Sequence, residues 1–162
     1  MKKKTVLVLM VLALALGVLA ACGGKTEYKA VAINEGVDKC EVCQMLIKDD
    51  QYATQIILKD QKPLKFDDLG DLYVWLNKNG RDKVGAAFVR DYYTKEWINL
   101  DQAVYVYDKG IKTPMSFGVV SFAKEADADK FIKEAGAGKK MTAKELDSHD
   151  WPHSMGGGHG GM

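Results

Sequence analysis

The sequence predicts an α+β protein made of two similar ββαβ lobes, each with a mixed or antiparallel sheet and one helix. Short runs of β-branched and aromatic residues, bounded by glycine, proline and aspartate, are typical of strands. Two longer segments place apolar residues at i, i+3, i+4 and i+7, which is the pattern of an amphipathic helix. The order strand, strand, helix, strand occurs twice along the chain. Because each half alone is small, we expect the two lobes to pack together or to pair strands.

The first lobe is assigned to residues 39–100 and contains the first helical pattern. Asp67 and Asp68 precede this helix, where carboxylates cap free backbone N–H groups and face the positive end of the helix dipole. The expected apolar face consists of Leu69, Leu72, Tyr73 and Leu76, and Gly80 is expected to end the helix. The predicted elements are, in order, a strand at 52–59, a turn at 60–63, a strand at 64–66, this helix, and a strand at 84–89.

The second lobe is assigned to residues 101–146 and repeats this order. The apolar face of its helix is expected to consist of Ala128, Phe131, Ile132 and Ala135, with Gly136 ending the helix. The predicted elements are, in order, a strand at 103–107, a turn at 108–110, a strand at 118–122, this helix over 128–135, and a short strand at 140–142.

Residues 1–21 have the organisation of a lipoprotein signal peptide. Three lysines follow Met1, an apolar run covers residues 6–21, and small residues precede Cys22. A basic region followed by an apolar region directs secretion. We expect cleavage before Cys22, a lipidated linker over residues 22–38, and a protein anchored by lipid to a membrane and facing its extracytoplasmic side. The alternative is a single membrane-spanning helix, because the run approaches the necessary length.

Charge and motif content argue against two broad classes of function. The formal net charge is +1, and the sequence has no basic patch of the kind that binds nucleic acid. Asp67-Asp68 is interpreted as helix capping, and Asp91 as the end of a strand. No nucleophile–base arrangement accompanies these carboxylates, so we do not expect an enzyme.

Two sulfur-containing clusters are candidates for a copper site. The first is Cys40-Glu-Val-Cys43-Gln-Met45, and the second is Pro114-Met115. Thiolate and thioether ligands favour Cu(I) over hard cations. In an extended segment Cys43 and Met45 would point the same way, because side chains alternate along a strand. Pro114 would stiffen the loop that presents Met115 as a third ligand.

Cys40 leaves several interpretations open. It is either a further copper ligand or the partner of Cys43 in a disulfide, which would make the protein a structural or scaffolding lipoprotein. A redox pair would require the cysteines to open a helix within a βαβ unit, and no such context is visible. Both methionines would otherwise be core residues. A Cys₂His₂ zinc site with His149 and His153 has suitable local spacings, but the two pairs lie far apart in the chain.

Residues 147–162 form a glycine-rich end that contains every histidine of the protein. We expect a flexible tail that collects metal, because glycine gives flexibility and His-rich tracts of low complexity often bind metals. Its candidate accessory ligands are His149, His153, Met155, His159 and Met162. The alternatives are an incidental composition, or a protein whose whole function is general collection of metal at the surface.

The ordered set of these motifs resembles the NosL family of lipoproteins. The matching positions are Cys40-x-x-Cys43-x-Met45-x-Ile47, Phe66-Asp67-Asp68, Asp91-Tyr92, Trp97-Ile98 and Thr113-Pro114-Met115, with Gly118 and Phe122 beyond them. Their order and intervals agree across residues 38–136, which is most of the mature chain. The sequence around Cys22 agrees with the same family independently.

The resemblance implies a Cu(I)-binding chaperone that supplies copper for the maturation of nitrous oxide reductase. Its implied partners are that reductase and the NosDFY transporter complex, and its implied fold is a pair of ββαβ units similar to organomercurial lyase. Carried over to this chain, the copper ligands are Cys43, Met45 and Met115. The His/Met tail is not part of the shared pattern, and the family includes relatives near other copper systems.

Overall fold

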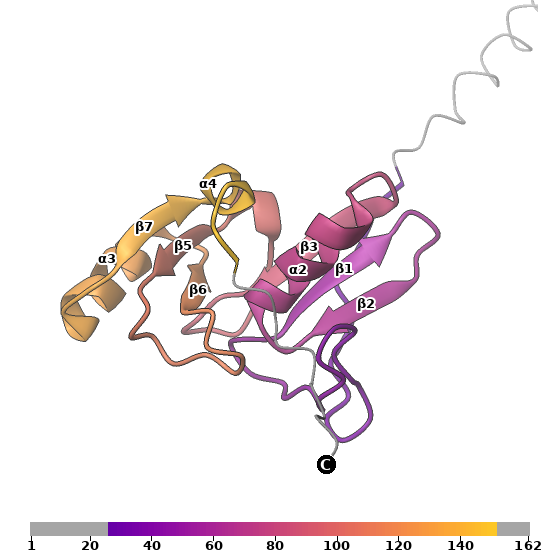
Figure 1. The fold of residues 1–162 in the computed structure, drawn as a ribbon, viewed down its shortest axis with the longest axis horizontal. Helices are drawn as coiled ribbons and strands as arrows, with labels where there is room; N and C mark the ends of the chain where they lie inside the picture. Colours follow the sequence, from indigo (N-terminus) through magenta and orange to yellow (C-terminus); the bar gives the residue numbers. More distant parts are fainter. Residues whose placement is uncertain (1–25, 152–162) are drawn as a thin grey trace, which may run out of the picture.

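The computed structural model describes residues 26–151, which form two antiparallel sheets with helices packed against them (Figure 1). The first half contains β1 (Thr54–Leu58), β2 (Pro63–Phe66), α2 (Leu69–Asn79), β3 (Val84–Arg90), β4 (Trp97–Asn99) and a 3₁₀ turn at Leu100–Gln102. The second half contains β5 (Val104–Tyr107), β6 (Val119–Phe122), α3 (Glu125–Ala135), β7 (Lys139–Thr142) and α4 (Ala143–Asp147). The predicted α+β class is therefore confirmed.

The first sheet has the strand order β2-β1-β3-β4, and every pair in it is antiparallel. The central strand β1 is almost wholly buried, because its side chains face the core on one side and other parts of the chain on the other. Helix α2 buries the predicted apolar face, which consists of Leu69, Leu72, Tyr73 and Leu76. Strand β4 was not predicted. It has only three residues, and its Trp97 lies under the Arg90 guanidinium, 3.9 Å from the ring centre.

The second sheet has the order β6-β5-β7 and carries α3. Its strands and helix lie where the sequence predicted them, although α3 begins at Glu125, earlier than expected. Ala128 is buried against Phe122, while Phe131 and Ile132 pack around this small cluster. Helix α3 has no side-chain cap at its start, which explains why the sequence did not mark that boundary.

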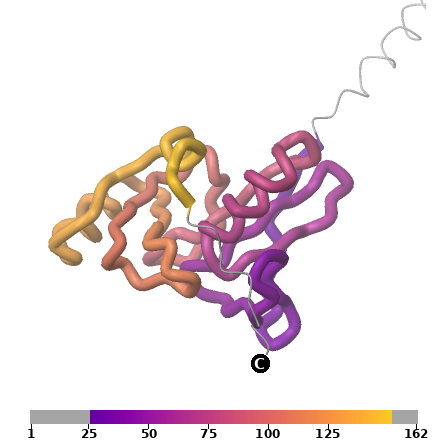
Figure 2. Tube along the Cα trace, viewed as in Figure 1, coloured from indigo at the N-terminus to yellow at the C-terminus, as the bar shows by residue number. Residues whose placement is uncertain are grey.

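The two halves lie side by side and share one hydrophobic core (Figures 1 and 2). The Phe117 ring, from the loop before β6, lies directly on Gly70 of α2, where no side chain larger than hydrogen fits. The junction is also hydrogen bonded: the Tyr92 backbone N–H donates to the Ser121 carbonyl (2.8 Å), and the Ser121 hydroxyl donates to the Arg90 carbonyl (2.6 Å). The expected packing of one lobe on the other is therefore present.

The segment before Cys40 was expected to be a lipidated linker over residues 22–38. Its described part, from residue 26, packs along the first sheet. The buried Gln55 amide pairs with both backbone groups of Val31, at 2.9 Å each, and Ile33 enters the core. The Tyr28 ring lies on Gly85. This segment lacks the alternation of a strand, and its partner is a polar side chain 24 residues away, so no local pattern predicts its packing.

The C-terminal segment also differs from the expectation of a free tail from residue 147. Trp151 is buried, its ring stacks on Tyr73 at 4.7 Å, and its Nε1–H donates to the Leu146 carbonyl at 3.0 Å. His149 lies edge-on between Tyr107 and Trp151. The prediction is therefore wrong for residues 147–151, because a Trp side chain outweighs the local polar composition.

Several predictions lie outside the described residues. These are the signal peptide, the lipidation of Cys22, and the tail positions His153, Met155, His159 and Met162. Within residues 26–151, no helix is long and apolar enough to cross a bilayer.

Candidate metal centre

The two core cysteines lie in a tight loop that is closed by backbone hydrogen bonds. Lys39 and Leu46 form an isolated antiparallel bridge, and the Cys40 N–H donates to the Met45 carbonyl at 2.9 Å. The Gln44 N–H donates back to the Cys40 carbonyl at 3.0 Å, and Gln44 has a φ of 63°. A left-handed residue reverses the chain locally. The segment from Cys43 to Met45 is therefore a turn, and the expectation of an extended segment is wrong.

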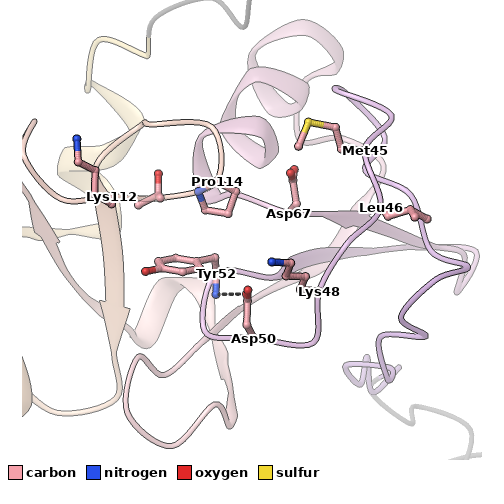
Figure 3. Close-up of a pocket in the computed structure, with 9 residues that line it drawn as sticks. Met45, Leu46, Lys48, Asp50, Tyr52, Asp67, Lys112 and Pro114 are labelled. Atoms are coloured by element: carbon pink, nitrogen blue, oxygen red, sulfur yellow. Dashed lines mark hydrogen bonds between the residues drawn. The ribbon is translucent and has the colours of Figure 1, made fainter.

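This turn separates the two predicted sulfur ligands. The Cys43 side chain is half-buried and packs against the core, whereas Met45 is 49% exposed. Met45 lines a pocket together with Asp67 and Pro114, and Figure 3 shows Met45 and Asp67 on the same side of this pocket. The volume of the pocket is about 350 Å³. Met45 thus lies at the exposed edge of this pocket, which Asp67 of the site also lines.

Two carboxylates that the sequence analysis assigned to other roles or passed over complete the cluster. The Cys43 Sγ lies 3.3 Å from Asp67 Oδ1, and the Cys40 Sγ lies 3.2 Å from Asp71 Oδ2. One ligand atom from each of these four residues lies within 4.8 Å of all the others. Both cysteines are free thiols, so the structure has no Cys40–Cys43 disulfide. The arrangement is a convergent set of donors that can hold a metal ion.

Burial gives the cluster an unusual protonation pattern. It raises the pKa of the Cys43 thiol to about 11, with the Asp67 carboxylate adding to the effect, and it raises the pKa of Cys40 further. Burial also raises the pKa of Asp71 to about 6. Four groups that would each be negative share a small, poorly hydrated volume, so protons remain on the thiols. A cation bound here would replace those protons and supply the missing positive charge.

Asp71 carries a further sign of an incomplete site. Its Oδ1 atom is buried and has no hydrogen-bond partner among the described residues. Leaving a buried carboxylate oxygen unpaired costs about 1–3 kcal/mol, and such atoms are rare in folded proteins. A metal ion between the carboxylates and the thiols is the kind of partner this oxygen lacks.

Asp68 fixes the second sulfur-containing motif beside the first. Its Oδ1 caps α2 by accepting from the Gly70 N–H at 3.2 Å, as predicted. Its Oδ2 accepts from the Thr113 hydroxyl at 2.6 Å and from the Met115 N–H at 2.9 Å. One buried carboxylate therefore joins the start of α2 to the Thr113–Met115 loop. Because Asp67 is the preceding residue, the same link ties the Met115 backbone to the neighbour of a cluster residue.

The structure thus brings Cys40 and Cys43 together, with Met45 lining the adjoining pocket and the Met115 backbone tied to Asp68. It does not bring His149 there, because that side chain packs between Tyr107 and Trp151. The Cys₂His₂ zinc alternative therefore lacks one of its histidines. The sequence analysis missed Asp67 and Asp71 as candidate ligands. Their spacing of four residues at a helix start, which puts both on one side, was the available signal.

The fold and this cluster together define a class: an α+β protein of two antiparallel sheets with a thiol–carboxylate candidate metal site between a loop and a helix start. The chain belongs to the NosL family, which it matches over residues 30–151. It is also similar in fold to the crystal structure of the copper chaperone NosL from Shewanella denitrificans. The TM-score is 0.66 at 24% sequence identity, covering 74% of this chain and 96% of that one. Comparison with curated proteins gave no match.

Proposed function

We propose that the protein is a copper chaperone that binds one Cu(I) ion at the cluster of Cys40, Cys43, Asp67 and Asp71. The observation that carries this proposal is the convergence of two thiols and two carboxylates, with a thioether motif on either side. Thiolate and thioether ligands favour soft ions such as Cu(I) over hard cations. Membership of the NosL family supports the same function, as does the similarity in fold to the copper chaperone NosL of Shewanella denitrificans.

In this proposal Cys43 is the principal ligand, and Met45 and Met115 are thioether ligands. Cys43 is the more accessible of the two thiols, and Met45 is exposed at the rim. Thioethers bind without losing a proton, so a site that uses them releases copper readily to an acceptor rich in thiolate or histidine. Asp67 and Asp71 would balance the charge of the ion. Such an arrangement suits a carrier of copper rather than an enzyme.

The pH dependence of Cu(I) binding tests this assignment and counts the thiolates. At neutral pH the Cys43 thiol is protonated, because burial holds its pKa near 11. Copper must displace that proton, so the association constant is expected to rise tenfold per pH unit between pH 7 and pH 9. A slope of two decades per unit would mean that Cys40 also becomes a thiolate ligand. The range lies above the Asp71 pKa of about 6, so that carboxylate adds no proton.

The measurement is a competition titration of the reduced protein against a chromophoric Cu(I) chelator at several pH values, with the chelator's own pH dependence subtracted. Cys40→Ser is the matched variant. It should keep a slope of one if Cys43 alone is a thiolate ligand, and should lower a slope of two to one if both bind. An affinity that does not change with pH would contradict thiolate ligation.

The client and the location are part of the proposal. We place the protein at the extracytoplasmic face of a membrane, held by a lipid on Cys22, and supplying copper to nitrous oxide reductase together with the NosDFY transporter complex. Family membership and the leader sequence support this. A strain lacking the protein is expected to make reductase with less than about a tenth of its copper. The wild-type chain should restore the copper and Cys43→Ser should not; full copper content in the deletion strain would refute this client.

A further inference from the structure

Half of the donors in the thiol–carboxylate cluster are hard oxygen atoms, which Cu(I) does not select. Asp67 and Asp71 each contact a thiol sulfur, at 3.3 and 3.2 Å. Asp71 is fully buried, and its Oδ1 atom has no hydrogen-bond partner among residues 26–151. Balancing the single charge of Cu(I) does not require a second buried carboxylate with an unpaired oxygen. The donor set therefore fits a second class of metal ion as well.

Two thiolates and two carboxylates form a ligand set for zinc. Zn(II) accepts both cysteine sulfur and carboxylate oxygen, and its structural sites are almost always four-coordinate and tetrahedral. The local spacings also fit, because such sites commonly combine a Cys-x-x-Cys pair with a second pair that has about three to five residues between its members. Here the pairs are Cys40-x-x-Cys43 in the loop and Asp67-x-x-x-Asp71 at the start of α2.

The dimensions of the cluster suit this ion. Tetrahedral zinc with sulfur and oxygen ligands keeps neighbouring donors roughly 3.4–3.8 Å apart. The two sulfur–oxygen contacts measure 3.2 and 3.3 Å, and all four donor atoms lie within 4.8 Å of one another. The Glu41 N–H donates to the Lys65 carbonyl at 3.0 Å, which ties the cysteine loop to β2 shortly before Asp67. Side-chain shifts of about 1 Å or less therefore bring the four donors around one ion.

Charge and depth separate this ion from Cu(I). With all four groups ionised the cluster carries four negative charges, so a divalent cation leaves one fewer of them uncompensated and is attracted more strongly. Cys40 and Asp71 are the deeply buried members, whereas Cys43 is half-buried and the Met45 thioether is exposed. A divalent ion thus binds at the inner donors, and Cu(I) binds at Cys43 and the outer sulfur atoms.

We propose that the cluster is also a tetrahedral Zn(II) site, with the four ligands Cys40, Cys43, Asp67 and Asp71. Binding forms two Zn–S and two Zn–O bonds, the two thiol protons pass to the buffer, and no electron is transferred. Zinc and copper exclude each other because both use Cys43. This exclusion rests on the proposed function, whereas the zinc site itself does not. Cu(I) is the softer ion and displaces zinc from the shared thiolate.

The test begins with an anaerobic titration of the reduced full chain with Co(II), which is a spectroscopic substitute for Zn(II). One equivalent should produce the intense visible bands of tetrahedral cobalt and a thiolate-to-cobalt charge-transfer band, and Zn(II) should abolish both. Cys40→Ser should halve the charge-transfer intensity per bound cobalt, because one of two thiolates is lost. Cobalt bound by histidines elsewhere in the chain would lack that band.

Asparagine variants separate the zinc site from the copper site. Asp67→Asn and Asp71→Asn should each weaken Zn(II) binding at least about a hundredfold in competition with a chromophoric zinc chelator, since losing a residue that only orients a ligand already costs about 10–100-fold. Each should weaken Cu(I) binding by less than about tenfold, because carboxylate oxygen is a poor ligand for Cu(I). Retained Cu(I) binding also shows that the variants are folded. Asp50→Asn is the matched control, because Asp50 lines the adjoining pocket outside the cluster.

The outcomes distinguish the zinc site from the proposed function. A full chain that binds neither Co(II) nor Zn(II), or equal zinc affinities in the wild type and both cluster variants, would overturn the zinc site while leaving the copper site intact. Zinc that stays bound at saturating Cu(I) would overturn the mutual exclusion. A chain that binds zinc as expected but has no tight Cu(I) site would overturn the proposed function alone.

Discussion

Replacing Cys43 with serine is expected to weaken Cu(I) binding by about a thousandfold, which corresponds to about 4 kcal/mol. The thiol is the accessible member of the cluster and lies 3.3 Å from Asp67. A serine hydroxyl is a hard donor and does not ionise at neutral pH, so it offers copper neither charge nor a soft ligand. The measurement is competition against a chromophoric Cu(I) chelator at fixed pH.

The same substitution should leave the fold intact, because Cys43 is only half-buried and serine keeps a hydrogen-bond donor for the Asp67 carboxylate. We expect its free energy of unfolding to lie within about 0.5 kcal/mol of the wild-type value. Met45→Leu is the matched control, since it removes the thioether at the rim while keeping the volume of the side chain. That variant should lose far less affinity. An unchanged affinity in Cys43→Ser would place the copper site elsewhere.

Replacing Asp68 with alanine is expected to lower the free energy of unfolding by about 3 kcal/mol. Loss of a helix cap costs about 1 kcal/mol, and leaving the buried Thr113 hydroxyl and Met115 N–H without an acceptor costs about 1–3 kcal/mol more. Both groups now donate to Asp68 Oδ2. Urea denaturation followed by circular dichroism gives the change.

Two further variants separate the two contributions to this loss of stability, which are the cap on α2 and the hydrogen bonds from Thr113 and Met115. Thr113→Val removes the hydroxyl donor and keeps the cap on α2, so it should show the smaller share of the loss. Asp68→Asn keeps one acceptor oxygen and should fall between wild type and alanine. Asp68→Ala should also weaken copper binding, because the loop that carries Met115 is no longer tied to the cluster. A loss of stability below about 1 kcal/mol would mean that this carboxylate does not join the two halves.

Periodicity predicted the scaffold well because the hydrophobic effect acts on patterns that are local in sequence. Helix α2 buries the four residues of its predicted apolar face. The predicted strands of both sheets lie at or near their expected positions. The missed elements are short or held by capping. Strand β4 has three residues, and α4 depends on a capping box between Thr142 and Glu145 rather than on an apolar face.

The site was only partly predictable, for a different physical reason. The cysteines and methionines are marked by their chemistry, whereas Asp67 and Asp71 acquire theirs from contacts with a loop more than twenty residues away. Asp67 also precedes Asp68, which caps α2. Helix capping therefore explained the Asp67-Asp68 pair without a metal. The orientation of Met45 depended on the positive φ of Gln44, a residue that usually avoids that conformation.

The packing of Tyr28 on Gly85 and the pairing of Gln55 with Val31 hold the start of the described chain against the first sheet. If the lipid is on Cys22 as proposed, the tether between the bilayer and the folded body is only the chain from Cys22 to Tyr28. This tether spans roughly 20 Å at full extension. The folded body would therefore begin within about that distance of the headgroups. A pull on the lipid would be borne first by the packing of Tyr28 on Gly85 and by the hydrogen bonds between Val31 and Gln55.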